Sequence, residues 1–218
     1  MKAWLIAVTL MVLGTLAGCG AGGNGSSNAN LTQAQARQVG STVSNDVSKA
    51  LASALGNAAV PLDITTRDNM LVALQRNNSQ ADAVSKPQDV TCNGSNCTVS
   101  GTYNCPDGGS ILVSGNFSGS GTSASGMFTE TPSSCSDGTL VINGNPAVTV
   151  AVQGNDNGVT TTVNLKIGGG VSFSPVQAGQ FPTGSCSFNV TASVSVNDSS
   201  GSVTSSSISG SVCGQAIQ

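Results

Sequence analysis

From Gln88 to the end of the chain, apolar residues recur at every second position. Val90 and Cys92 alternate with polar neighbours, and Cys97 and Val99 do the same. A period of two places alternate side chains on opposite faces of a strand. Clusters of Gly, Asn, Asp, Ser and Pro separate the alternating segments, and none is long enough for the crossovers that parallel strands need. We therefore expect a mainly β protein, an antiparallel β-meander folded as a curved sheet, a sandwich or a barrel-like structure.

The expected strands follow this alternation. After a first hairpin over 88–101, they cover 110–118, 122–130, 138–143, 146–153, 158–167, 170–174, 185–196 and 202–213. In a hairpin, the residue numbers of every facing pair add up to the same total. The turn at Gly154–Gly158 then places Val148 opposite Val163 and Val152 opposite Val159.

A helix is expected before the β-region. Thr32-Gln33-Ala34-Gln35 has the capping-box pattern, and Gly56 is suited to end the helix. We expect one amphipathic helix over 32–55 whose apolar stripe packs on the sheet rather than forming a groove for a ligand or partner. The stripe recurs every four residues and has alanines beside it: Val39, Val43, Val47, Leu51 and Leu55, with Ala36, Ala50 and Ala54.

The N-terminus has the layout of an export signal. Lys2 precedes an apolar stretch that ends in Leu16-Ala17-Gly18-Cys19, and this stretch is shorter than the ~20 residues of a membrane-spanning helix. The ending resembles the lipobox of bacterial lipoproteins. This resemblance implies that the leader is removed and that Cys19 carries a diacylglycerol, so that acyl chains such as palmitate anchor the protein. The alternative is a soluble secreted protein cleaved after Ala17 or Gly18.

The resemblance also implies a location. In Gram-negative bacteria an Asp after the lipidated cysteine usually means retention at the inner membrane, whereas this chain has Gly20. We expect a lipid-anchored protein of the cell envelope, at the outer membrane if the cell is Gram-negative. The chain then divides into a signal peptide (1–18), a lipidated flexible tether (19–30), a helical segment (31–86) and an antiparallel β domain (87–218). A short second helix after Thr66 carries Met70.

Six further cysteines are expected to form three disulfides. An even number in an exported chain is typical of disulfides, and a zinc site would need a C-x-x-C knuckle or histidines, which the chain lacks. In the first hairpin one register pairs Val90 with Val99 and Cys92 with Cys97. Cys186 and Cys213 lie symmetrically about the turn 197–201, which leaves Cys105 with Cys135. No metal and no other cofactor are expected.

Composition excludes several classes of function. Only 8% of the residues are charged and no histidine occurs, so neither a basic nucleic-acid surface nor an ordinary Ser-His-Asp or Cys-His site is expected. Asp107 and Asp137, each in a Cys-x-Asp-Gly phrase, are a conceivable carboxylate pair or Ca²⁺ site, but two Asp-Gly turns are favoured. The same choice applies to Asn155-Asp156-Asn157-Gly158, where a hairpin turn is favoured over a calcium loop.

Other polar residues allow similarly ordinary interpretations. An isopeptide cross-link from Lys166 to an Asn, assisted by Glu130, is disfavoured because Lys166 falls on the polar face of its strand, where a charge discourages edge-to-edge association. Threonines such as Thr160 and Thr162 form polar ladders that are able to contact glycans or ordered water.

These observations favour a non-enzymatic envelope lipoprotein with a structural or binding role. Its membrane contact is through Cys19, and its partner is a protein or a glycan. The second hypothesis is a carrier that holds a lipid or another apolar ligand in a cavity of the curved sheet. A hydrolase built on an unusual carboxylate pair is the third.

Overall fold

One helix lies before the sheet in the part of the chain that the computed structural model describes, residues 29–56, 70, 89–154, 160–200 and 202–218. Helix α1 spans Gln33–Gly56. Its N-terminus has the expected capping box: the Gln35 N–H donates to Thr32 Oγ1 at 3.3 Å, and the Thr32 N–H donates to Gln35 Oε1 at 3.0 Å. Every residue of the apolar stripe is buried, so the expected helix is confirmed.

Eleven strands form one antiparallel sheet in the described residues. Its hydrogen-bonded order is β1-β2-β3-β4-β7-β8-β9-β10-β11, with β5 beside β6 and β6 beside β8. This order confirms the meander. The strands are β1 (Asp89–Asn93), β2 (Asn96–Asn104), β3 (Ser110–Ser120), β4 (Ser123–Ser133), β5 (Cys135–Ser136), β6 (Leu140–Gly144), β7 (Ala147–Gly154), β8 (Thr160–Pro175), β9 (Gly184–Asn197), β10 (Val203–Val212) and β11 (Gln215–Ile217).

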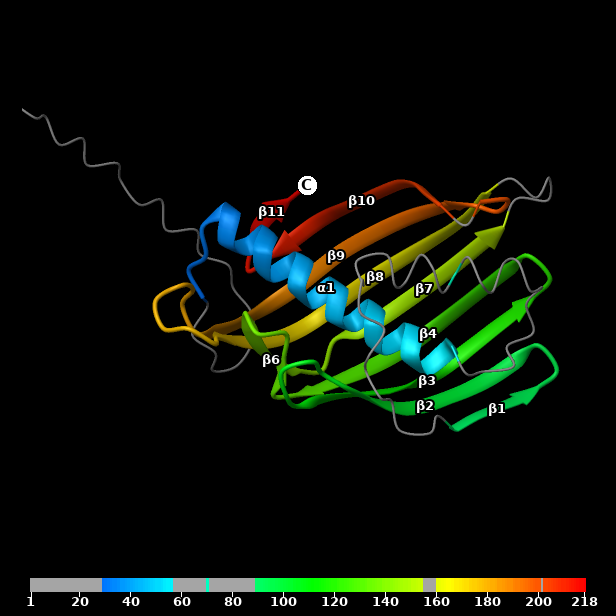
Figure 1. Ribbon diagram of the computed structural model, residues 1–218, viewed down its shortest axis with the longest axis horizontal. Coiled ribbons are helices and arrows are strands. Elements are labelled where there is room, and N and C mark those ends of the chain that lie inside the picture. The colour runs from blue at the N-terminus through cyan, green and yellow to red at the C-terminus, as the bar shows by residue number, and fades with distance from the viewer. Residues whose placement is uncertain (1–28, 57–69, 71–88, 155–159, 201) are drawn as a thin grey trace, which may run out of the picture.

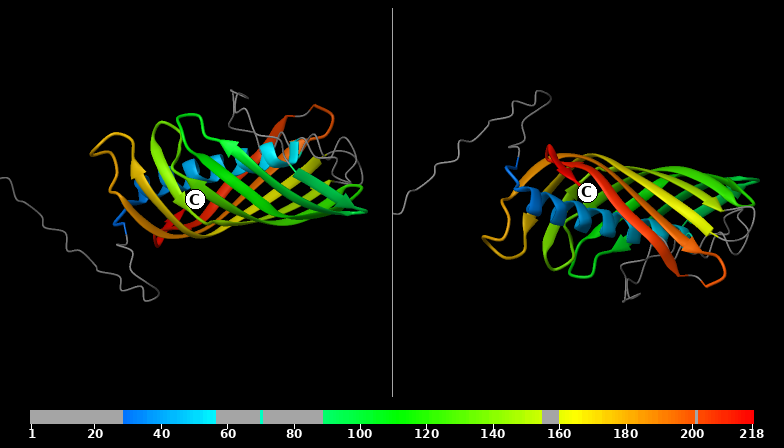
Figure 2. Two further views of the ribbon diagram at one scale, coloured as in Figure 1. Left: turned by 90° about the horizontal axis from the view of Figure 1, so that it is seen from below. Right: turned by 90° about the horizontal axis from the view of Figure 1, so that it is seen from above.

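The sheet is a single curved layer that remains open, with β1 and β11 at its two edges. Of the three architectures expected for the β-region, the curved sheet is therefore correct. Helix α1 crosses the sheet diagonally (Figure 1), and the sheet curves around the helix (Figure 2). We call this concave face the trough.

The trough and α1 share one hydrophobic core. Alternate residues of the long strands are buried, as in β9, where Phe188, Val190, Ala192, Val194 and Val196 all face inward. The helix stripe belongs to the same cluster of buried side chains. Packing against the sheet was the expected role of the stripe, and this prediction is confirmed.

Two expected strands, 158–167 and 170–174, are one strand in the structure. Strand β8 continues through Gly168-Gly169-Gly170, pairing with β7 before these glycines and with β6 after them. Gly169 has a φ of 121°, a conformation that suits glycine, so the strand bends there without ending. The prediction of a strand boundary at these glycines is therefore wrong.

The expected register between β7 and β8 was also wrong, by four residues. Val152 lies opposite Val163, and Val148 lies opposite Ile167 instead of Val163. A shift of four leaves every side chain on the same face, so alternation alone cannot distinguish the two registers. The observed register aligns Leu165 and Ile167 with buried valines of β7, and this additional apolar contact favours it.

Several predictions fall outside the described residues. They concern the leader, Cys19, most of the tether, the turn at 155–158 and most of the short second helix. Of that helix, Met70 is helical and buried. No helix within the described ranges is both long and apolar enough to cross a membrane.

Candidate functional site

The three disulfides form as the sequence predicts: Cys92–Cys97, Cys105–Cys135 and Cys186–Cys213. In the first hairpin the predicted register is confirmed, with Val90 opposite Val99 and Cys92 opposite Cys97. Cys213 is one residue out of register with Cys186, because the pairing of β9 with β10 shifts between Val203 and Ser205. Cys213 has a φ of 53° and donates its N–H to the carbonyl of Ser187 at 3.1 Å. The bulge and this backbone turn bring the two sulfurs together.

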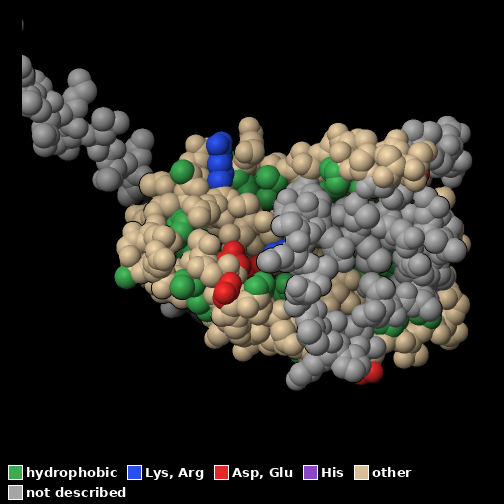
Figure 3. Space-filling model, viewed as in Figure 1, with side chains coloured by type: hydrophobic (Ala, Val, Ile, Leu, Met, Phe, Trp, Pro, Cys, Tyr) green, Lys and Arg blue, Asp and Glu red, His purple; other side chains and the backbone are tan. Residues whose placement is uncertain are grey.

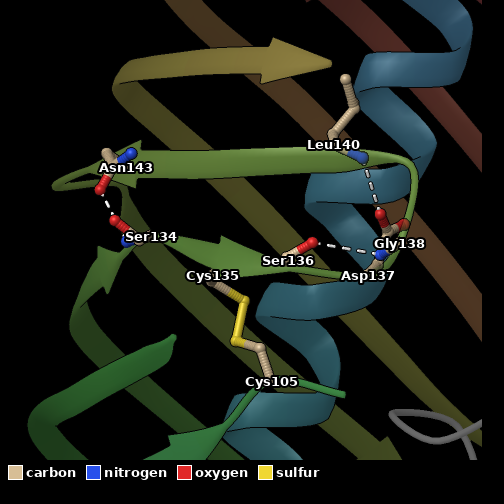
Figure 4. The surroundings of a disulfide bond; sticks show 8 residues. All are labelled: Cys105, Ser134, Cys135, Ser136, Asp137, Gly138, Leu140 and Asn143. Atoms are coloured by element: carbon tan, nitrogen blue, oxygen red, sulfur yellow. Dashed lines mark hydrogen bonds between the residues drawn. A yellow bond between two sulfur atoms is a disulfide. The ribbon is translucent and has the colours of Figure 1, made fainter. Parts of the chain in front are cut away.

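The Cys105–Cys135 disulfide joins two turns that also pair through their backbones. The Asp107 N–H donates to the Ser136 carbonyl at 3.1 Å, and the Ser136 N–H donates to the Gly108 carbonyl at 2.9 Å. Asp137 Oδ1 accepts from the amide of Thr139 at 2.8 Å and from the amide of Leu140 at 2.9 Å, and Figure 4 shows the second of these bonds. Gly108 and Gly138 both have positive φ. The turn interpretation is therefore supported for this region.

The described residues hold no group of three or more His, Cys, Asp or Glu side chains arranged to bind a metal ion. Lys166 is exposed on the convex face, whereas Glu130 is buried on the opposite face of the sheet. The isopeptide hypothesis, which needs these two groups together, has no geometric support.

A buried carboxyl pair, Asp46 of α1 and Glu130 of β4, was missed by sequence reasoning. Glu130 is 0% exposed and Asp46 is 2% exposed. Among the described residues, neither Glu130 carboxyl oxygen has a hydrogen-bond partner, and Asp46 Oδ2 has none. Burial of polar groups without partners destabilises a fold, so this arrangement requires a physical account.

Burial dominates the electrostatics of the carboxyl pair. It raises the pKa of Asp46 from 3.8 to about 7; the charge of Asp137 contributes in the same direction, and Lys49 opposes it. The pKa of Glu130 is raised well above its usual range, first by burial and then by the charge of Asp46. The same two causes raise the pKa of the buried Tyr103 to about 12. Near neutral pH Asp46 is therefore partly protonated, and the equilibrium of Glu130 is shifted in the same direction, toward its neutral form.

Two signals in the sequence point to the carboxyl pair. Glu130 is two residues after Phe128 in the same strand, so both side chains point to the same face, which the alternation identifies as apolar. Asp46 lies three residues after Val43 and four before Ala50, which places it on the flank of the helix stripe. Asp107 and Asp137 do not belong to the pair; the Asp107 carboxyl lies against Gly138, the residue after Asp137. Acidic side chains are visible at the surface in Figure 3.

The convex face of the sheet carries a groove of about 690 Å³ over β1, β2, β3, β4 and β7, which we call the outer groove. None of the described residues that line it is charged. Met127 is 72% exposed and is flanked by hydroxyl and amide side chains. Strand pairing places one row of these residues side by side across five strands: Thr91, Thr98, Asn116, Met127 and Thr149.

Comparison with known proteins gives no assignment. No family model, no curated protein and no solved structure matches the chain. The outer groove and the carboxyl pair are therefore interpreted from their own geometry.

Proposed function

We propose that the protein is a non-enzymatic lipoprotein of the bacterial cell envelope that binds a neutral glycan in the outer groove. The lipobox-like ending at Cys19 supports an anchored protein, in the outer membrane if the cell is Gram-negative. The three disulfides suit an oxidising compartment outside the cytoplasm. The observation that carries the binding role is the uncharged outer groove with its row of hydroxyl and amide groups.

The chemistry of the outer groove matches a glycan. Thr, Ser and Asn side chains can both donate and accept hydrogen bonds, as sugar hydroxyls do. The exposed Met127 and the threonine methyl groups offer apolar contact to the C–H faces of sugar rings. Neighbouring strands lie about 4.8 Å apart, so the row presents a side chain at intervals close to the length of a sugar unit, and all of these side chains except Met127 are polar. A charged ligand would find no opposite charge there.

The placement of the carboxyl pair does not suit catalysis. Glycosidases and other carboxylate enzymes use their acid pair in an open cleft that admits the substrate. Asp46 and Glu130 are closed off between α1 and the sheet. A lipid carrier is disfavoured as well, because the side chains of the helix stripe fill the part of the trough beneath α1.

The first prediction tests the anchor. Replacing Cys19 with serine should abolish incorporation of an alkyne-labelled fatty acid, because serine has no thiol for the acyl-glycerol to join. The variant should also leave the membrane fraction or keep its leader. Mass spectrometry and fractionation of cells that express the parent and the variant measure both effects. An unlabelled parent protein recovered in the soluble fraction would disprove the anchor.

The second prediction tests the outer groove. Asn116 lies in the groove, so Asn116→Arg should fill it and weaken binding of a neutral oligosaccharide by about tenfold or more, a loss of about 1.4 kcal/mol. Asn189 is an exposed residue of β9 on the same convex face but outside the groove, and Asn189→Arg is the matched control. Isothermal titration with a panel of uncharged chito-, cello- and malto-oligosaccharides provides the measurement. Failure of the parent to bind any of them, or an equal loss in both variants, would refute the glycan proposal.

A further inference from the structure

The carboxyl pair lies at the contact between α1 and the trough. Asp46 belongs to the helix, whereas Glu130 belongs to the inward face of β4, on the same side as Phe128. Each is almost completely removed from solvent, and three of their carboxyl oxygens have no hydrogen-bond partner among the described residues. Two buried acids on separate elements, close enough for the charge of one to act on the other, are a poor permanent connection, because ionisation of both creates two desolvated like charges.

The other charged and titratable groups near the carboxyl pair come from each neighbouring element. Lys49 lies one turn along α1, Tyr103 projects from β2, and Asp137 lies in the turn between β5 and β6. Lys49 is the one cation that acts on Asp46 within the described residues, and Asp137 counteracts it. No cation of the described residues contributes to the electrostatics of Glu130. Protonation of the two carboxyls therefore determines how much negative charge this contact holds.

We propose that Asp46 and Glu130 make the docking of α1 in the trough dependent on protons. With both carboxyls protonated, the helix is held by its apolar stripe and no buried charge opposes it. With a single proton bound, the interface holds one buried negative charge. Loss of both protons places two negative charges on opposite sides of the interface, and the helix loosens from the trough while the disulfide-linked sheet persists. This device is independent of the outer groove, which lies on the other face.

The protein contains a natural reporter for this motion. Tyr103 is the single tyrosine of the chain, and it is buried among the core residues with the helix stripe. Its pKa of about 12 keeps it a neutral phenol through pH 9, so its own titration does not disturb the measurement. Trp4 is the single tryptophan and falls in the leader, so Trp4→Phe in the full-length chain leaves Tyr103 as the main fluorophore.

The experiment measures acrylamide quenching of Tyr103 fluorescence in the full-length Trp4→Phe chain, in neutral detergent, between pH 5 and pH 9. The quenching constant should rise by about threefold or more as local opening of α1 exposes the phenol. Far-ultraviolet circular dichroism at each pH verifies that the sheet remains folded. Hydrogen exchange of the α1 amides, corrected for the intrinsic effect of pH, should show a parallel loss of protection.

Matched variants identify the source of the rise. Asp46→Asn/Glu130→Gln keeps the shape of both side chains but removes their titration, so quenching should stay constant with pH. The single variant Glu130→Gln keeps only Asp46 as a titrating group of the pair, so its quenching constant should rise less with pH than that of the parent. This variant replaces the double variant in the comparison if the double variant does not fold. Asp89→Asn/Asp107→Asn removes two exposed carboxylates and should behave like the parent. Constant quenching in the parent, or an undiminished rise in both Glu130→Gln variants, would overturn the proposal.

Discussion

Glu130→Gln should make the protein more stable at pH 8 and leave its stability at pH 4 nearly unchanged. Glutamine has almost the shape of a protonated glutamate but never ionises, so folding no longer requires the uptake or retention of a proton at this buried position. Each pH unit over which the folded state alone keeps a proton lowers the free energy of unfolding by about 1.4 kcal/mol. We expect a gain in the free energy of unfolding at pH 8, measured by urea denaturation, that disappears at pH 4.

The direction of the parent's pH dependence follows from the raised pKa values. Asp46 has a pKa of 3.8 when unfolded and about 7 when folded, so only the folded chain keeps this proton between these values. The unfolded chain then binds fewer protons, and stability falls as pH rises. The contribution of Asp46 is full below pH 3.8 and decreases by up to about 4 kcal/mol by pH 7. Glu130 extends the decline in the same direction, since its pKa is raised well above 4.5.

The control for this prediction is Asp89→Asn, which removes an exposed carboxylate from β1. It should leave the slope of stability against pH close to that of the parent. A parent that becomes more stable from pH 5 to pH 8, or a Glu130→Gln variant that is less stable than the parent at pH 8, would contradict the assignment of Glu130 as a protonated buried acid.

The second large effect is expected from the disulfide near the C-terminus. Replacing Cys186 and Cys213 with alanine removes a bond between residues 27 apart and should lower the free energy of unfolding by about 3–4 kcal/mol. The chain-entropy account predicts this loss because the unfolded chain regains the freedom of the closed loop. Strands β10 and β11 at the sheet edge should be most affected.

The Cys92–Cys97 pair supplies the comparison. These residues are five apart, so the same double replacement by alanine should cost about 2 kcal/mol. Denaturation of the oxidised parent and both variants under identical conditions measures the difference. If loss of Cys92–Cys97 destabilises the protein as much as loss of Cys186–Cys213, loop length does not determine the contribution of these bonds.

The sequence predicts the faces of the elements well. Alternation over β2, β4, β7 and β9 identifies which side chains enter the core, because one face of an antiparallel sheet must leave water. The capping box locates the start of α1 to within one residue, because it depends on side chains adjacent in sequence. The same hairpin argument that assigns Cys92 to Cys97 is reliable because their turn is short.

Long-range geometry is less accessible. The register of β7 with β8 depends on the length of the intervening loop, and shifts of an even number of residues keep the alternation unchanged. The bulge between Val203 and Ser205 has no clear signal in a serine-rich strand, although it determines how Cys213 reaches Cys186. Whether the sheet closes into a barrel or stays open depends on the curvature of all the strands together. No single segment of the sequence determines that curvature, so the sequence does not distinguish the two structures.

The carboxyl pair shows a different limit. Acidic residues in a glycine-rich chain are expected in turns, and Asp107 and Asp137 conform to that rule. Glu130 satisfies the strand alternation but violates the rule that charges are exposed, so composition and periodicity disagree at this one position. Such a disagreement is itself a signal of a functional or strained residue. The electrostatic effect of Asp46 on Glu130 can be recognised only from the fold, because the two residues are far apart in the sequence.

The two ends of the described chain lie at one end of the molecule. Gln33 at the start of α1 donates its side-chain N–H to the carbonyl of Ala216, and Ala29 packs against Gly184. From Gly184, β9 runs its 14 residues to the opposite end, a length of about 45 Å. If Cys19 carries the anchor, the tether enters the fold at this end, and the hairpin turns at Asn93–Asn96 and Ser120–Ser123 lie at the opposite end. A fluorescent or epitope tag added after Gln218 would lie near the bilayer, and one inserted at Gly121 would report on the space above it.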